Sequence, residues 1–106
     1  MIYKVRAKVI EERLGEFFEK LTDGTIHAQR PDGQEMVASM KRAKLTMPGM
    51  VEWYEMCLCP TPLLHERKTH YDSYFSEIET EPVEDYSEVE GTSFWSYMES
   101  IKSSRE

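Results

Sequence analysis

The sequence contains little cysteine and lacks long hydrophobic runs. Its 106 residues include two cysteines, too few for the disulfide framework of a small secreted domain. No segment approaches the roughly 18 consecutive apolar residues of a transmembrane helix. The first residues alternate apolar and basic side chains, without the apolar stretch of a signal peptide. These absences predict a soluble cytoplasmic protein with no membrane partner.

Basic residues are scarce in the second half of the chain. The formal net charge is −7, and residues 76–90 hold seven acidic side chains and no basic one. An acidic surface repels polyphosphate, so neither nucleic acid nor an anionic membrane is an expected partner. Two interpretations of the acidic stretch stay open: a solvated edge that keeps the protein in solution, or a docking surface for a basic partner.

Apolar residues, by contrast, are sufficient for one core. They make up 40% of the chain, and aromatic residues make up 11%, which argues against global disorder. We expect residues 1–106 to form a single domain. Its last part, residues 84–106, is predicted to be an acidic linker followed by a helix that docks on the domain.

Hydrophobic periodicity predicts four strands and three helices. Alternation with period two predicts strands over residues 2–10, 35–46, 50–59 and 76–83, and helical spacing predicts helices over residues 11–22, 63–75 and 92–103. The strand over 35–46 needs a bulge near Met40 and Lys41, because its two halves have opposite parity. Met47-Pro48-Gly49 predicts the turn of a hairpin.

This order, βαββαβ with a final helix, predicts an α+β protein of the ferredoxin-like type. That arrangement has a four-stranded antiparallel sheet in the order 4-1-3-2, with two helices on one face, plus the C-terminal helix. The charges support it, because strands 4 and 1 are then neighbours on the helix-free face. Three glutamates would lie beside three basic residues: Glu77, Glu79 and Glu81 beside Lys4, Arg6 and Lys8.

The strand over 50–59 is apolar on both parities, and we expect Trp53, Glu55 and Cys57 on the helix-free face with Arg6. Such a face needs a cover, either the C-terminal helix or a second copy of the chain, and a homodimer is predicted. Beneath it, Arg6, Trp53 and Glu55 are candidate ligand-binding residues. Arg6 would bind a carboxylate, Trp53 would offer a flat platform, and Glu55 would transfer a proton. A purely structural Arg6–Glu55 salt bridge is the other interpretation.

The sequence contains two pairs of residues of types that bind metals, a histidine pair and a cysteine pair, but no metal site is predicted at either. His65 and His70 lie about 140° apart around a helix and cannot bind one ion from it. They are interpreted as an ordinary helix surface with His70 at its boundary, where Glu66 and His70 can pair weakly.

Cys57 and Cys59 would lie on one strand face, with their Cα atoms about 6.6–6.8 Å apart, at the far edge of disulfide geometry. A metal site there lacks a second cysteine pair. The two thiols are interpreted as small hydrophobic groups. A nucleophilic Cys57 is the alternative, if Arg6 or Lys8 lowers its pKa.

In topology, residues 2–83 resemble the dimeric α+β-barrel group of ferredoxin-like proteins. That group includes small monooxygenases acting on quinone-like substrates, haem-degrading enzymes, lactone isomerases and many uncharacterised bacterial proteins. The resemblance implies ligand sites between sheet and helices or within the barrel. It provides no catalytic motif, so no catalytic residue is assigned.

The main hypothesis is a protein that binds or transforms a small organic molecule in a pocket at the sheet face, without a cofactor. As an enzyme, it would use acid–base chemistry on an organic acid or a quinone-like molecule. The alternative is a structural or protein-interaction module without catalytic activity. The same strand order occurs in RNA-binding domains, but here the helix-free face presents basic residues instead of aromatic ones on its first strand.

Overall fold

The computed structural model describes residues 1–105, with side chains up to residue 103, so the end of the predicted docking segment at residue 106 lies outside it. Five strands form one antiparallel sheet in the order β4-β1-β3-β2-β5. The strands are β1 (Ile2–Val9), β2 (Lys44–Met47), β3 (Met50–Met56), β4 (Phe75–Val83) and β5 (Thr92–Ser93). The predicted order 4-1-3-2 is present, but β5 extends the sheet beyond the predicted four strands.

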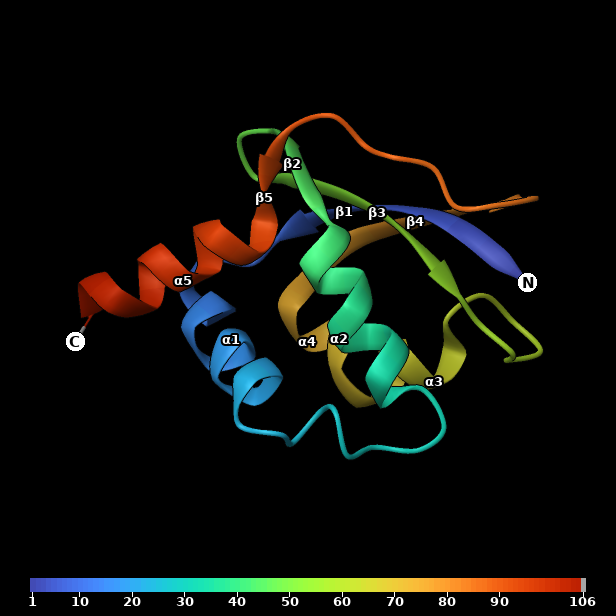
Figure 1. Cartoon of the computed structure of the whole chain (residues 1–106), viewed down its shortest axis with the longest axis horizontal. Helices are drawn as coiled ribbons and strands as arrows, with labels where there is room; N and C mark the ends of the chain where they lie inside the picture. The colour runs from blue at the N-terminus through green and yellow to red at the C-terminus, as the bar shows by residue number, and fades with distance from the viewer. Residues whose placement is uncertain (106) are drawn as a thin grey trace.

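The helices lie together on one side of the sheet and form a second layer (Figure 1). They are the 3₁₀ turn η1 (Glu11–Arg13), α1 (Leu14–Thr22), α2 (Gly33–Arg42), α3 (Leu64–Glu66), the π-helical η2 (Arg67–Tyr71), α4 (Asp72–Tyr74) and α5 (Phe94–Arg105). The predicted α+β class is confirmed. Within the described residues, none of the helices has the length and apolar character needed to cross a membrane.

The first strand and helix form as their periodicity predicts. Tyr3, Val5 and Ala7 alternate along β1 and are buried, because side chains two apart share a face of the sheet. The stripe of α1 that packs on this face is also buried and consists of Leu14, Phe17, Phe18 and Leu21. These two elements supply much of the hydrophobic core.

Most of the predicted strand over 35–46 is wrong, because residues 33–42 form helix α2. Met36, Val37 and Met40 are buried, at spacings that place them on one side of a helix. The mixed parity that suggested a bulge near Met40 is therefore the pattern of an amphipathic helix. Only the last part of the segment joins β2, which pairs with β3 as the predicted hairpin.

The predicted face of β3 is also wrong. Trp53 pairs with Val5 and Glu55 with Tyr3, so both side chains point into the helix-covered core, and both are fully buried. Cys57 is buried as well. Because β3 is apolar on both parities, alternation alone does not decide which face is covered. The cross-strand register decides it by extending the buried layer of β1.

The helix-free face carries paired charges, as predicted. Arg6 lies opposite Glu79, and Lys4 lies opposite Glu81. At a register shift in β4, the Lys8 ammonium lies 2.6 Å from Glu77, whose backbone is left-handed with φ of 49°. Oppositely charged neighbours on adjacent strands favour this pairing.

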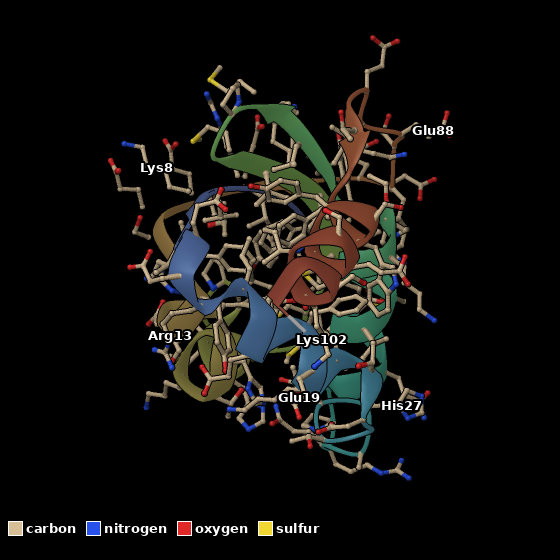
Figure 2. The ribbon with its side chains drawn as sticks, turned by 90° about the vertical axis from the view of Figure 1, so that its left-hand side faces the viewer. Lys8, Arg13, Glu19, His27, Glu88 and Lys102 are labelled. Carbon is tan, nitrogen blue, oxygen red and sulfur yellow. The ribbon has the colours of Figure 1, made fainter. Side chains whose placement is uncertain are left out.

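The C-terminal helix does not cover that face, contrary to one expectation. It packs beside α1 and α2 on the helical side, with Phe94 and Met98 fully buried. Figure 2 shows Lys102 of α5 near Glu19 of α1, and their charged groups lie 3.7 Å apart. Since Trp53 lies in the core, the argument for a cover on the helix-free face no longer holds, and the homodimer stays a prediction.

Candidate functional site

The three predicted ligand-binding residues do not lie together. Arg6 is exposed on the helix-free face, whereas Trp53 and Glu55 are enclosed on the other side of the sheet. The expected constellation of Arg6, Trp53 and Glu55 is therefore wrong in its geometry, because β3 presents the opposite parity to the core. Neither an Arg6–Glu55 salt bridge nor a shared pocket can form across the sheet.

Glu55 instead forms a closed polar contact within the aromatic core. Its Oε1 accepts hydrogen bonds from Trp53 Nε1 at 2.8 Å and from the Tyr71 hydroxyl at 2.7 Å. Its Oε2 is buried and has no hydrogen-bond partner among the described residues. Burial raises the pKa of the Glu55 carboxyl well above its usual range, and the two hydrogen bonds oppose this shift without cancelling it. The neutral acid form is favoured.

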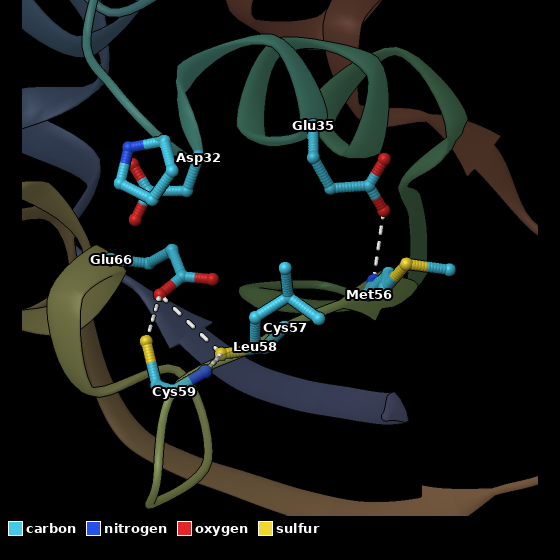
Figure 3. Close-up of a pocket in the computed structure, with 8 residues that line it drawn as sticks. Asp32, Glu35, Met56, Cys57, Leu58, Cys59 and Glu66 are labelled. Carbon is cyan, nitrogen blue, oxygen red and sulfur yellow. Dashed lines mark hydrogen bonds between the residues drawn. The ribbon is translucent and has the colours of Figure 1, made fainter.

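A cavity of about 270 Å³ opens on the helical side, away from the predicted constellation. It lies between the start of α2, the end of β3 and the first turn of α3 (Figure 3). Its apolar walls are Pro31, Met56 and Leu58. Three carboxyl groups and two thiols complete the lining: Asp32, Glu35, Glu66, Cys57 and Cys59.

The end of β3 and the turn after it bring the thiols to this cavity. The Cys57 N–H donates to the carbonyl of Met1 at 2.8 Å, which extends the β1–β3 pairing by one residue. The chain then turns back through the Pro60-Thr61-Pro62 segment. Leu63 follows with a left-handed φ of 55° and a fully buried side chain. A leucine in this conformation costs about 1–2 kcal/mol, which its burial offsets.

Helix α3 starts directly after this turn and places Glu66 against the thiols. Glu66 Oε1 lies 3.4 Å from Cys59 Sγ and 3.7 Å from Cys57 Sγ. Figure 3 shows the carboxylate turned toward both sulfur atoms. Glu66 is 1% exposed and Cys57 is 3% exposed, whereas Cys59 is half-buried, and both cysteines are free. The three groups form a compact cluster at the cavity wall.

A nucleophilic Cys57 activated by Arg6 or Lys8 is not supported. Both basic residues lie on the opposite face of the sheet. Burial above all, with smaller contributions from the Cys59 side chain and Glu66, raises the pKa of the Cys57 thiol to about 12 against opposing backbone hydrogen bonds. In the absence of an ion, Cys57 is therefore a protonated thiol.

The other two carboxylates of the cavity have strong partners. Asp32 accepts from Gln29 Nε2 at 2.9 Å and lies 2.6 Å from His65 Nδ1. Glu35 lies at the rim, and its Oε2 accepts three hydrogen bonds. The donors are the Met56 N–H at 2.8 Å, the Tyr86 hydroxyl at 2.7 Å and Arg42 at 3.2 Å.

His70, predicted to pair with Glu66 on a helix surface, is buried and contacts Gln29 Oε1 at 2.9 Å through Nε2. His65 and His70 thus have separate partners, Asp32 and Gln29.

Glu66, interpreted from the sequence as a helix-surface partner of His70, is instead buried against the two thiols. The predicted helix over 63–75 began one residue before α3 and continued as regular α-helix, whereas α3 begins at Leu64 and passes into the π-helical η2. The change from α-helical to π-helical geometry alters which side chains of this segment face the core. The usable signal was a Cys-x-Cys pair, a Pro-x-Pro turn and a carboxylate seven residues after the second cysteine.

Comparisons with models of known protein families, with curated proteins and with solved structures found no match to this chain. The function of this protein is therefore inferred from the geometry and chemistry of the cavity.

Proposed function

We propose that this protein binds a small organic molecule in the cavity between α2, the end of β3 and α3. The observation that carries this proposal is the cavity itself, which combines apolar walls with converging polar groups. Ligand sites typically have that composition. At about 270 Å³, the cavity accommodates a small metabolite and not a large cofactor.

The lining favours a neutral or cationic molecule. Asp32, Glu35 and Glu66 are acidic, and no basic side chain lines the cavity among the described residues. These groups would repel a carboxylate ligand. The organic-acid substrate that Arg6 was expected to bind therefore has no support at this cavity. A quinone-like molecule or a small amine with an apolar body fits better, because the apolar walls would bury its carbon skeleton.

Together with this function, we propose that the fold is of the ferredoxin-like type. Four strands lie in the order that the resemblance to the dimeric α+β-barrel group implies. The cavity lies between sheet and helices, one of the two places where that resemblance puts ligand sites. A homodimer is proposed on the same resemblance, and fold alone identifies no reaction.

The interaction-module alternative has one surface in its favour. Residues 84–88 are exposed and carry three acidic side chains, which suit a basic partner. The C-terminal helix supports it less, since Phe94 and Met98 are already buried against the chain's own core.

Thermal shift and native mass spectrometry test the proposal with a panel of small amines, quinone-like compounds and carboxylic acids. Leu58→Trp places a bulky ring at the cavity, and Leu58 is 84% exposed, so the change spares the core. Leu64→Trp is the matched control, because Leu64 is also exposed but lines a separate groove.

We expect stabilisation by amines or neutral aromatic compounds that is lost in Leu58→Trp and kept in Leu64→Trp. Stabilisation by carboxylic acids alone, or equal binding to both variants, would contradict the proposal. The same spectra report whether the chain forms a dimer.

A further inference from the structure

We propose that Cys57, Cys59 and Glu66 form a binding site for a thiophilic divalent cation, with Zn²⁺ as the reference ion. The three ligand atoms lie within 4.8 Å of one another at the wall of the cavity. The site goes beyond the proposed organic ligand and does not require it.

Two of the three distances between the donor atoms match tetrahedral coordination, and the two sulfur atoms lie within 4.8 Å of each other. A zinc ion binds thiolate sulfur at about 2.3 Å and carboxylate oxygen at about 2.0 Å, so at the tetrahedral angle these two atoms lie about 3.5 Å apart. The distances from Glu66 Oε1 to the two sulfur atoms are 3.4 and 3.7 Å, on either side of that value. Small side-chain rotations would therefore close the site around an ion.

The surroundings of Glu66 supply the second argument. Its carboxylate is almost fully buried, yet its hydrogen-bond donors are two thiols, which are weak donors. No ion pair among the described residues includes Glu66. A buried carboxylate without a cation or strong donors is costly. A bound cation would supply the missing positive charge.

The backbone already holds the thiols in place for such an ion. The Cys59 N–H donates to Cys57 Sγ at 3.2 Å, an interaction that also stabilises negative charge on a metal-bound sulfur. The left-handed Leu63 fixes the turn between the cysteines and α3. The ligands thus come from two segments joined by a short, partly buried turn, which reduces the entropy lost on binding.

The donor set selects the type of ion. Two sulfur ligands favour Zn²⁺ and similar soft ions over Mg²⁺ and Ca²⁺, which prefer oxygen. Binding replaces the proton on each thiol, so two protons leave as one cation enters. The nearby carboxylates of Asp32 and Glu35 add attraction for a cation.

Three protein ligands leave one tetrahedral position free, and all three of these ligands line the cavity. Sites with this open position hold water or a ligand on the ion. A small neutral molecule in the cavity would then lie next to the bound ion, whereas a cationic molecule would be repelled by it, so the two proposals are linked without depending on each other.

Titration of the reduced chain with Co²⁺ under anaerobic conditions tests the site. Cobalt replaces zinc in thiolate sites and reports coordination through a near-ultraviolet sulfur-to-cobalt charge-transfer band and visible bands of tetrahedral geometry. Competition with Zn²⁺ and a chelator gives the affinity. The variants are Glu66→Gln and Cys59→Ala, which spare the buried Cys57. Glu79→Gln is the control, because it removes the same charge from the opposite face of the sheet.

We expect one Co²⁺ per chain with a charge-transfer band, displaced by Zn²⁺. Glu66→Gln and Cys59→Ala should weaken the affinity by about 100-fold or more, since losing even an outer-shell partner costs about 10–100-fold. Glu79→Gln should change it less than about threefold, because solvent screens a distant exposed charge.

A folded, reduced chain that gives no charge-transfer band would overturn the proposal, as would a band of unchanged affinity in Glu66→Gln. Either outcome leaves the organic-ligand proposal standing if Leu58→Trp still abolishes ligand binding. Conversely, a cobalt site in a chain that binds no compound of the panel supports the metal site alone.

Discussion

Glu55 and Glu66 are both almost completely buried on the helical side of the sheet, but their surroundings differ in kind. Glu55 receives hydrogen bonds from an indole N–H and a phenol hydroxyl and is enclosed by aromatic rings. Glu66 meets two thiols and borders a cavity. A carboxyl group with strong neutral donors, as at Glu55 Oε1, is held in place by the fold itself, even though Glu55 Oε2 has no hydrogen-bond partner among the described residues. One that has only weak donors and adjoins a cavity is prepared for a partner from outside.

The largest effect is expected from removing Glu55. Glu55→Ala leaves Trp53 Nε1 and the Tyr71 hydroxyl buried without an acceptor and opens a cavity, so stability should fall by at least about 3 kcal/mol. Glu55→Gln keeps an acceptor oxygen at that position and should cost less than about 1 kcal/mol. Urea unfolding at pH 7 measures both. Equal losses in the two variants would show that an acceptor oxygen at this position is not sufficient to preserve stability.

Glu66, unlike Glu55, is expected to affect stability through zinc binding, and this can be measured by unfolding the protein with and without zinc. At a free Zn²⁺ concentration of about 100 times Kd, the unfolding free energy should rise by about 2.7 kcal/mol, and a chelator should reverse the gain. Glu66→Gln should lose most of this gain at the same zinc concentration.

In metal-free buffer, Glu66→Gln should stay within about 1 kcal/mol of the parent chain or exceed it, because the hydrogen bonds that it changes come from two thiols, which are weak donors. A large loss of metal-free stability would instead place Glu66 in the same structural class as Glu55. Thermal unfolding with and without chelator separates the two cases.

His70 extends the comparison to a buried base. Burial lowers its pKa, and the nearby Lys20 lowers it further. Below the ordinary histidine pKa of about 6.5, the unfolded chain binds a proton that the folded His70 does not. Stability should therefore fall as the pH drops from about 6.5 to the lowered pKa, by at most about 1.4 kcal/mol per pH unit from this residue.

His70→Gln should flatten this part of the stability profile, whereas the exposed His27→Gln should leave more of the slope in place. Urea unfolding between pH 5 and 7.5 compares the two variants. The same slope in His70→Gln and in the parent chain would assign the pH dependence to other groups.

The smallest effect is expected at Arg6, on the far side of the sheet. Arg6→Met removes an exposed side chain opposite Glu79 and should change stability by less than about 0.5 kcal/mol. Neither Co²⁺ affinity nor ligand binding should change. A loss of ligand binding in Arg6→Met would show that the ligand binds on the helix-free face and not in the cavity beside Glu66.

Much of the fold follows from local patterns. The alternation in β1 and the stripe on α1 were sufficient, because each buries one clean face. The opposite charges of β1 and β4 supported the pairing that the predicted strand order implies, and the two strands are neighbours in the sheet. The pattern failed for α2, where medium-sized apolar residues at mixed spacing fit a strand nearly as well as a helix.

The candidate site depended on information that alternation does not contain. Both faces of β3 are apolar, so the placement of Glu55 required the register with β1. The meeting of Cys57, Cys59 and Glu66 required a turn with a left-handed leucine, followed by a helix that changes from α to π after one turn. Such irregular geometry is set by tertiary packing and is not visible in residue spacing.

The outer strands of the sheet have a consequence for how chains of this protein meet each other. A long, regular strand at a sheet edge is a template for pairing with another molecule. Here β5 covers part of β2, and β4 is interrupted by a register shift, by the left-handed Glu77 and by Pro82, which has no N–H to donate (Figure 1). Glutamates along β4 add repulsion between copies. The edges thus discourage strand-by-strand aggregation between copies of the chain.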